Sequence, residues 1–268
     1  MQKLEKKIYF YTDPLNDEFS GIKRTPPAID HTYKYERKNL FYRIGTFFVY
    51  RIVMKLVAKV YSKLKFRVQF VNGELLKKYN GESIFVFGNH TNVPHDAYAI
   101  NALSFTKNIS FLVSPENVAV PGTRLFMSMV GSIPVPNKLS GMRNFTKCIE
   151  NICKNPGRKG RIIVVYPEAH IWPYYTKIRP FTDQSFQYPI QFGSKVFAMT
   201  TTYQPRKNSD KVNVTVYVDG PFVADTTLGN KAARKKLRDE VYKKMVERSK
   251  NSTVEVNEFV FREEKVDD

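Results

Sequence analysis

Residues 83–103 constrain the fold of this 268-residue chain most, because they join a strand to a helix through a short polar loop. The first five of these residues form an apolar run rich in strand-forming side chains, and a glycine ends it. The helix that follows would begin at Pro94, with Asn92 or Val93 as its cap. A strand that leads directly into a helix is typical of α/β proteins.

Two side chains of this unit can carry chemistry. His90 lies in the loop at the carboxyl end of the strand, the edge at which open α/β sheets bind ligands, and Asp96 lies in the first helical turn. An imidazole oriented by a carboxylate is a general base, so we predict His90 as the base and Asp96 as its partner. Two alternatives are a capping or packing role for His90 and, more weakly, a metal site that includes His95.

The remaining chain alternates strands and helices. Strands are expected at residues 66–71, 109–113, 161–166, 195–203 and 212–218, and helices at 121–130, 142–154 and 231–250. This order predicts an α/β domain over residues 66–268, with a mixed, largely parallel central sheet flanked by helices and a charged C-terminal helix. Residues 1–38 are polar and contain prolines, and we expect them to form an irregular lead-in.

Residues 40–65 predict an amphipathic helix. Apolar residues recur near helical spacing, and a basic stripe runs beside them, made of Arg43, Arg51, Lys55, Lys59 and Lys63. Helices of this kind lie in the plane of anionic membranes, although a surface helix with solvated lysines fits the same pattern. The formal net charge of +18 also favours a polyanionic partner. We therefore predict that residues 1–65 comprise the lead-in and a membrane-association helix.

The expected location is the cytoplasmic face of a membrane, with peripheral attachment. No stretch reaches the roughly 18 uncharged apolar residues that a membrane-spanning helix needs. No secretory signal is visible, and the two cysteines, Cys148 and Cys153, are expected to be free thiols.

Three further segments place charged side chains in loops or at strand ends. Glu168 directly follows the strand expected at residues 161–166, which puts it at the same sheet edge as His90. Residues 131–138 follow the helix that carries Arg124 and end in Lys138, with Arg143 a few residues later. Two more cations, Lys177 and Arg179, follow the Glu168 segment.

Together these blocks resemble the glycerolipid acyltransferases of the lysophosphatidic acid acyltransferase type. Asn89-His90 with Asp96 resembles the first motif of that family, which is Asn-His, four residues, then Asp. The blocks that resemble the second, third and fourth motifs are Gly131-Ser132-Ile133-Pro134-Val135, Tyr166-Pro167-Glu168-Ala169 and the strand near residues 196–200. The resemblance covers roughly residues 67–205 in the order of the family.

The chain departs from the family pattern at three points. Five residues rather than four separate His90 from Asp96, so the pair must form across the loop-to-helix junction. Ala169 and His170 replace the usual Gly-Thr, and the Asp-Arg that commonly ends the second motif is missing. The last two departures leave the identity of the acyl acceptor open.

The resemblance implies an enzyme that moves a fatty acyl group from a thioester, acyl-CoA or acyl carrier protein, to a lysophospholipid. The acceptor would be 1-acylglycerol-3-phosphate and the product phosphatidic acid. His90 would deprotonate the acceptor hydroxyl while Asp96 holds the imidazole, without an acyl-enzyme, a metal or a cofactor. The substrate contacts that the resemblance suggests are Asn89, Arg124, Lys138, Arg143, Glu168, Lys177 and Arg179.

Two alternatives remain at this point. Another acceptor, such as glycerol-3-phosphate or a different lysolipid, is compatible with the altered second and third blocks. A non-catalytic basic protein that binds anionic lipid or nucleic acid would also explain the charge, although no nucleic-acid-binding motif is recognisable and we expect no nucleic-acid partner.

Overall fold

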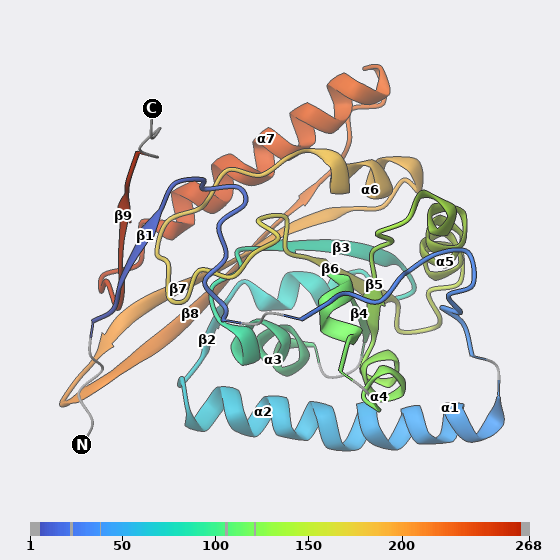
Figure 1. The fold of residues 1–268 in the computed structure, drawn as a ribbon, viewed down its shortest axis with the longest axis horizontal. Helices are drawn as coiled ribbons and strands as arrows, with labels where there is room; N and C mark the ends of the chain where they lie inside the picture. Colours follow the sequence, from blue (N-terminus) through green and yellow to red (C-terminus); the bar gives the residue numbers. More distant parts are fainter. Residues whose placement is uncertain (1–5, 22–23, 38, 105–106, 121, 264–268) are drawn as a thin grey trace.

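The computed structural model describes residues 6–21, 24–37, 39–104, 107–120 and 122–263. Its centre is a seven-stranded sheet in the order β2-β8-β7-β3-β6-β4-β5 (Figure 1). The strands are β2 (Gln69–Val71), β3 (Ser83–Gly88), β4 (Asn108–Val113), β5 (Ser132–Pro134), β6 (Arg161–Val165), β7 (Val196–Arg206) and β8 (Ser209–Phe222). All neighbours pair in parallel except β7 and β8, which form a long antiparallel hairpin. The predicted α/β class with a largely parallel sheet is confirmed.

Helices cover both faces of the sheet. One face packs against α3 (Val93–Leu103), and the other against α5 (Met142–Lys154), α6 (Gln187–Gln191) and α7 (Asn230–Ser249). Within the charged helix α7, Leu237, Val241 and Met245 form an apolar stripe at helical spacing and pack into the core. Strand β3 lies at the centre of the sheet with all six residues buried, so the loop after it is held on a rigid base.

Several short elements connect these strands and helices. They are α4 (Arg124–Met129) and the 3-10 turns η2 (Gly73–Lys78), η3 (Pro115–Val118), η4 (Leu139–Gly141) and η5 (Gln184–Phe186). Helix α4 is shorter than the predicted 121–130, and Pro121 lies outside the described residues. The edge strand β5, which follows α4, was not predicted.

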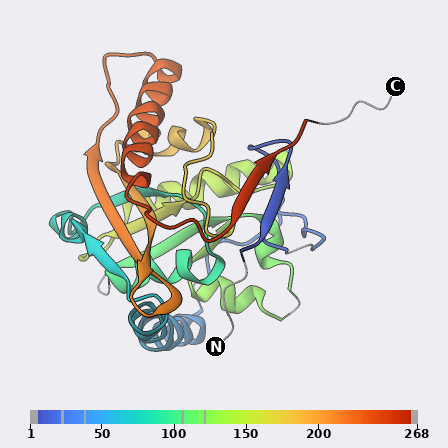
Figure 2. The ribbon, with the colours of Figure 1, turned by 90° about the vertical axis from the view of Figure 1, so that its left-hand side faces the viewer.

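The expectation of an irregular lead-in over residues 1–38 was wrong in one part. Strand β1 (Ile8–Tyr11) pairs in parallel with β9 (Glu258–Phe261) in a separate two-stranded sheet (Figure 2). Aromatic rings stabilise this pairing, because Tyr9 stacks on Phe259 and Phe259 stacks on Trp172. The strand forms because the far end of the chain supplies its partner.

The predicted amphipathic helix is present as a continuous rod along the outside of the molecule (Figure 1). It comprises α1 (Leu40–Thr46), a π-helical stretch η1 (Phe47–Met54) and α2 (Lys55–Leu64). Among the described residues, no helix combines the length and the apolar character needed to cross a bilayer.

The orientation of this helix corrects the idea of a fully solvated basic stripe. Lys55 is completely buried, and its Nζ donates hydrogen bonds to the backbone oxygens of Ser104 and Lys107 at 2.5 and 2.7 Å. The stripe therefore faces the body of the protein at Lys55, while Lys59 and Lys63 remain exposed. The outward face is mostly apolar and comprises Leu40, Phe41, Ile44, Phe47, Phe48, Ile52, Val53, Leu56, Val57, Val60 and Leu64.

Candidate active site

His90 and Asp96 form the predicted pair. His90 Nδ1 lies 2.8 Å from Asp96 Oδ2, where β3 gives way to α3. The carboxylate is buried, whereas 19% of the His90 side chain is exposed to solvent. Because Asp96 accepts from Nδ1, the proton of the neutral imidazole is held there and Nε2 is left as the basic nitrogen.

Asp96 is fixed from several directions. The same Oδ2 atom accepts hydrogen bonds from the backbone N–H groups of Thr91 and Asn92, both at 2.9 Å. Asn92 in turn caps α3, because its side chain accepts from the backbone N–H of His95. The loop thus wraps around the carboxylate, and this wrapping accommodates the fifth residue between His90 and Asp96.

His95 takes no part in this arrangement. Its imidazole is fully buried beside the ring of Phe66, and neither ring nitrogen has a hydrogen-bond partner among the described residues. Burial lowers the pKa of His95 and keeps it neutral. The described part of the chain also contains no cluster of three or more side chains suited to hold a metal ion.

Tyr166, which the sequence analysis quoted only as part of a block, shapes the site directly. Its ring stacks on the imidazole of His90, with centroids 4.4 Å apart and planes inclined by 14°. Its hydroxyl donates to the backbone oxygen of Asp96 at 2.6 Å. Burial raises the pKa of Tyr166 well above its ordinary value, so the hydroxyl remains a donor. Only its position directly after a buried strand, two residues before Glu168, could have indicated this role.

Asn89 ties the loop that carries His90 to the neighbouring strand. Its Nδ2 donates to the backbone oxygen of Thr201 at 3.0 Å, and its Oδ1 accepts from the backbone N–H of Thr201 at 2.8 Å. Two residues further along, Thr91 Oγ1 lies 2.6 Å from the hydroxyl of Tyr203. Asn89, expected as a substrate contact, is therefore buried and fully engaged with β7.

Glu168 and Arg179 form a buried pair behind His90. Glu168 Oε2 accepts from the backbone N–H of His90 at 3.0 Å, and its Oε1 accepts from the backbone N–H of Arg179 at 2.9 Å. The guanidinium Nη2 lies 3.6 Å from Glu168 Oε2 and also donates to the backbone oxygens of Glu168 and His170. Burial raises the pKa of Glu168, and the nearby Arg179 opposes that rise. The pair therefore holds the loop that carries His90 rather than presenting free charges at the surface.

The other predicted substrate contacts are surface side chains. Arg124, Lys138, Arg143 and Lys177 are all exposed. The guanidinium of Arg124 lies over the ring of Tyr33, 4.4 Å from its centroid. No described hydrogen bond or ion pair links these four side chains to His90 or Asp96.

The site occupies the fold of a known enzyme. No protein-family model and no curated protein matches this sequence. A solved structure does match, the crystal structure of the 1-acyl-sn-glycerophosphate (LPA) acyltransferase PlsC from Thermotoga maritima. The TM-score is 0.51 at 18% sequence identity, and the match covers 80% of this chain and 95% of PlsC. The chain has the fold of PlsC. At this identity the likeness establishes the architecture, so the chemistry must be argued from the site itself.

Proposed function

We propose that this protein is an O-acyltransferase that moves a fatty acyl group from a thioester to the free hydroxyl of a lysophospholipid. The observation that carries the proposal is the 2.8 Å contact between His90 Nδ1 and Asp96 Oδ2, at the carboxyl end of a buried strand in a PlsC-like fold. We propose 1-acylglycerol-3-phosphate as the acceptor and phosphatidic acid as the product.

The residues support a direct transfer. His90 Nε2 takes the proton of the acceptor hydroxyl as its oxygen attacks the thioester carbonyl, and Asp96 stabilises the resulting imidazolium. The tetrahedral intermediate then collapses with cleavage of the carbon–sulfur bond. The departing thiolate regains a proton from the imidazolium, which restores neutral His90. Tyr166 and the Glu168–Arg179 pair hold the imidazole and its backbone in place throughout.

The activity test uses purified protein, a labelled acyl thioester and vesicles. We expect ester formation with lysophosphatidic acid, supplied with either acyl-CoA or acyl carrier protein as the donor. Glycerol-3-phosphate and lysophosphatidylcholine serve as competing acceptors in parallel reactions. Faster acylation of a competing acceptor would change the proposed substrate, and failure with every acceptor and donor would contradict the proposed activity.

We propose that the enzyme is attached peripherally to the cytoplasmic face of a membrane, and the outer helix supports the attachment. A row of large apolar side chains faces outwards along α1, η1 and α2, and Phe41 is 82% exposed. A contiguous apolar surface of this size marks an interaction site, and a helix of this kind lies in the membrane interface. Anionic lipid is the partner we propose, because Lys59 and Lys63 lie exposed beside the apolar row.

We expect the triple substitution of Phe41, Phe47 and Phe48 by serine to weaken binding to anionic vesicles by about 100-fold or more, because each buried Phe contributes roughly 1.5–3 kcal/mol. Co-sedimentation with vesicles measures the partition coefficient. The matched control replaces Val223 and Leu228, two exposed apolar residues that follow β8, by serine and should bind like the wild type. Unchanged binding of the triple variant would show that this face does not contact the membrane.

A further inference from the structure

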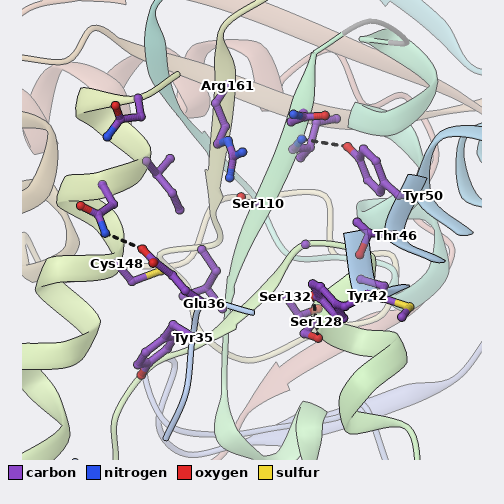
Figure 3. A pocket seen from close by; sticks show the side chains of 18 of the residues that line it. Tyr35, Glu36, Tyr42, Thr46, Tyr50, Ser110, Ser128, Ser132, Cys148 and Arg161 are labelled. Atoms are coloured by element: carbon purple, nitrogen blue, oxygen red, sulfur yellow. Dashed lines mark hydrogen bonds between the residues drawn. The ribbon is translucent and has the colours of Figure 1, made fainter. Parts of the chain in front are cut away.

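A cavity of about 530 Å³ lies at the opposite end of the strands from His90 (Figure 3). Its walls come from β4, β5 and β6, from α5, and from the inner side of α1 and η1. Arg161 in this cavity pairs in register with Ser83 at the start of β3, whereas His90 follows the end of that strand. A strand of this length spans about 17 Å, so the cavity is a separate site.

Polar side chains interrupt the buried sheet face at this cavity. In the parallel register, Asn108 is opposite Arg161 and Ser110 is opposite Ile163, so these four residues project from the same face. That face packs beneath α5, and Ser110 is only 4% exposed. Strands of a parallel sheet covered on both faces are normally almost continuously apolar. Asn108, Ser110 and Arg161 therefore present polar groups to the cavity, and the Nε of Arg161 has no hydrogen-bond partner among the described residues.

Arg161 lacks a counter-ion within the described part of the chain. Its Nε is buried without a hydrogen-bond partner, and no described carboxylate lies within ion-pair distance of its guanidinium. Glu36 also lines the cavity, but its Oε1 accepts a hydrogen bond from Asn151 on α5. Burial lowers the pKa of Arg161, yet a guanidinium stays protonated in proteins. Arg161 is half-buried, and a partly desolvated charge without a counter-ion is costly, which favours an external anion in this position.

We propose that this cavity binds a small organic anion, with its phosphate or carboxylate group on Arg161. The hydroxyls of Ser110 and Ser132 and the amide of Asn108 line the same cavity and can donate to the oxygens of the ligand. The carbon part would lie against Tyr42 and Ile133. Figure 3 shows the Arg161 side chain extending into the cavity, with Ser110 and Ser132 on neighbouring strands.

The test measures binding of three probes to the full chain by titration calorimetry: inorganic phosphate, glycerol 3-phosphate and octanoate. We expect at least one probe to bind the wild type, and Arg161→Gln to weaken that binding tenfold or more. The matched control is Arg158→Gln, an exposed arginine in the turn before β6, which should bind like the wild type. Tighter binding of the two phosphates would identify the bound group as a phosphate, and tighter binding of octanoate would identify it as a carboxylate. Either result supports the proposal.

A second measurement separates loss of binding from loss of folding. Without ligand, Arg161→Gln should unfold at the same temperature as the wild type or higher, because it removes a half-buried charge that has no counter-ion in the described part of the chain. The best probe should raise the unfolding temperature of the wild type but not that of Arg161→Gln. His90→Ala should retain probe binding, so the result does not depend on the acyl-transfer activity. Absence of binding by all three probes, or equal binding by wild type and Arg161→Gln, would overturn the proposal.

Discussion

Replacing His90 with alanine is expected to lower the acyl-transfer rate by about 100- to 10,000-fold, the range that general-base catalysis contributes. The variant loses the nitrogen that accepts the hydroxyl proton, while its backbone N–H can still bind Glu168. The fold and vesicle binding should therefore persist. Initial rates at saturating acceptor and donor measure the loss of activity. The circular dichroism spectrum shows whether the fold persists, and co-sedimentation with vesicles shows whether membrane binding does.

Asp96→Asn tests the other half of the pair. Asp96 Oδ2 receives three contacts, from His90 Nδ1 and from the backbone N–H groups of Thr91 and Asn92. An amide can keep the shape but loses the negative charge that stabilises the imidazolium, so we expect a fall in kcat comparable with that of His90→Ala. His31→Ala, which removes an exposed histidine outside the site, is the matched control and should retain full activity. Full activity of either active-site variant would exclude the proposed base.

The His90–Asp96 pair could be predicted because it is local. Both residues lie in one strand–loop–helix unit, and the strand, the loop and the cap at Asn92 each carry their own sequence signal. The extra residue relative to the family motif is absorbed by the loop, whose backbone N–H groups turn towards the carboxylate. Sequence spacing alone could not specify that turn, because it depends on the backbone dihedral angles of Thr91 and Asn92.

Features set by distant contacts were predicted less well. Strand β1 depends on β9 at the opposite end of the chain, so the local sequence of residues 8–11 could not identify its partner. The amphipathic helix was predicted from its periodicity, but its apolar side faces outwards. That orientation depends on two carbonyl groups, of Ser104 and Lys107, which accept hydrogen bonds from buried Lys55. Periodicity reveals that a helix has two faces and does not reveal which one the core accepts.

Arg179→Met is expected to destabilise the protein by about 3–5 kcal/mol, the usual cost of leaving one member of a buried ion pair without its partner. Glu168 would remain buried between the backbone N–H groups of His90 and Arg179, without the guanidinium that balances its charge. The guanidinium also lies over the ring of Trp172 and donates to the backbone oxygen of Pro14, so the lead-in would loosen as well. Chemical denaturation measures the free energy of unfolding.

Two further variants show whether the unpaired charge of Glu168 causes the destabilisation expected for Arg179→Met. Lys177→Met removes an exposed cation two residues away and should change the free energy of unfolding by less than about 0.5 kcal/mol. Glu168→Gln combined with Arg179→Met removes both charges, and we expect it to be more stable than Arg179→Met alone, because no unpaired carboxylate remains buried. Its acyl-transfer rate should still fall below that of the wild type, since the amide no longer holds the His90 backbone as strongly. If the double variant is no more stable than Arg179→Met, lost packing rather than charge dominates the destabilisation, and Glu168 and Arg179 support the His90 loop mainly by their shape.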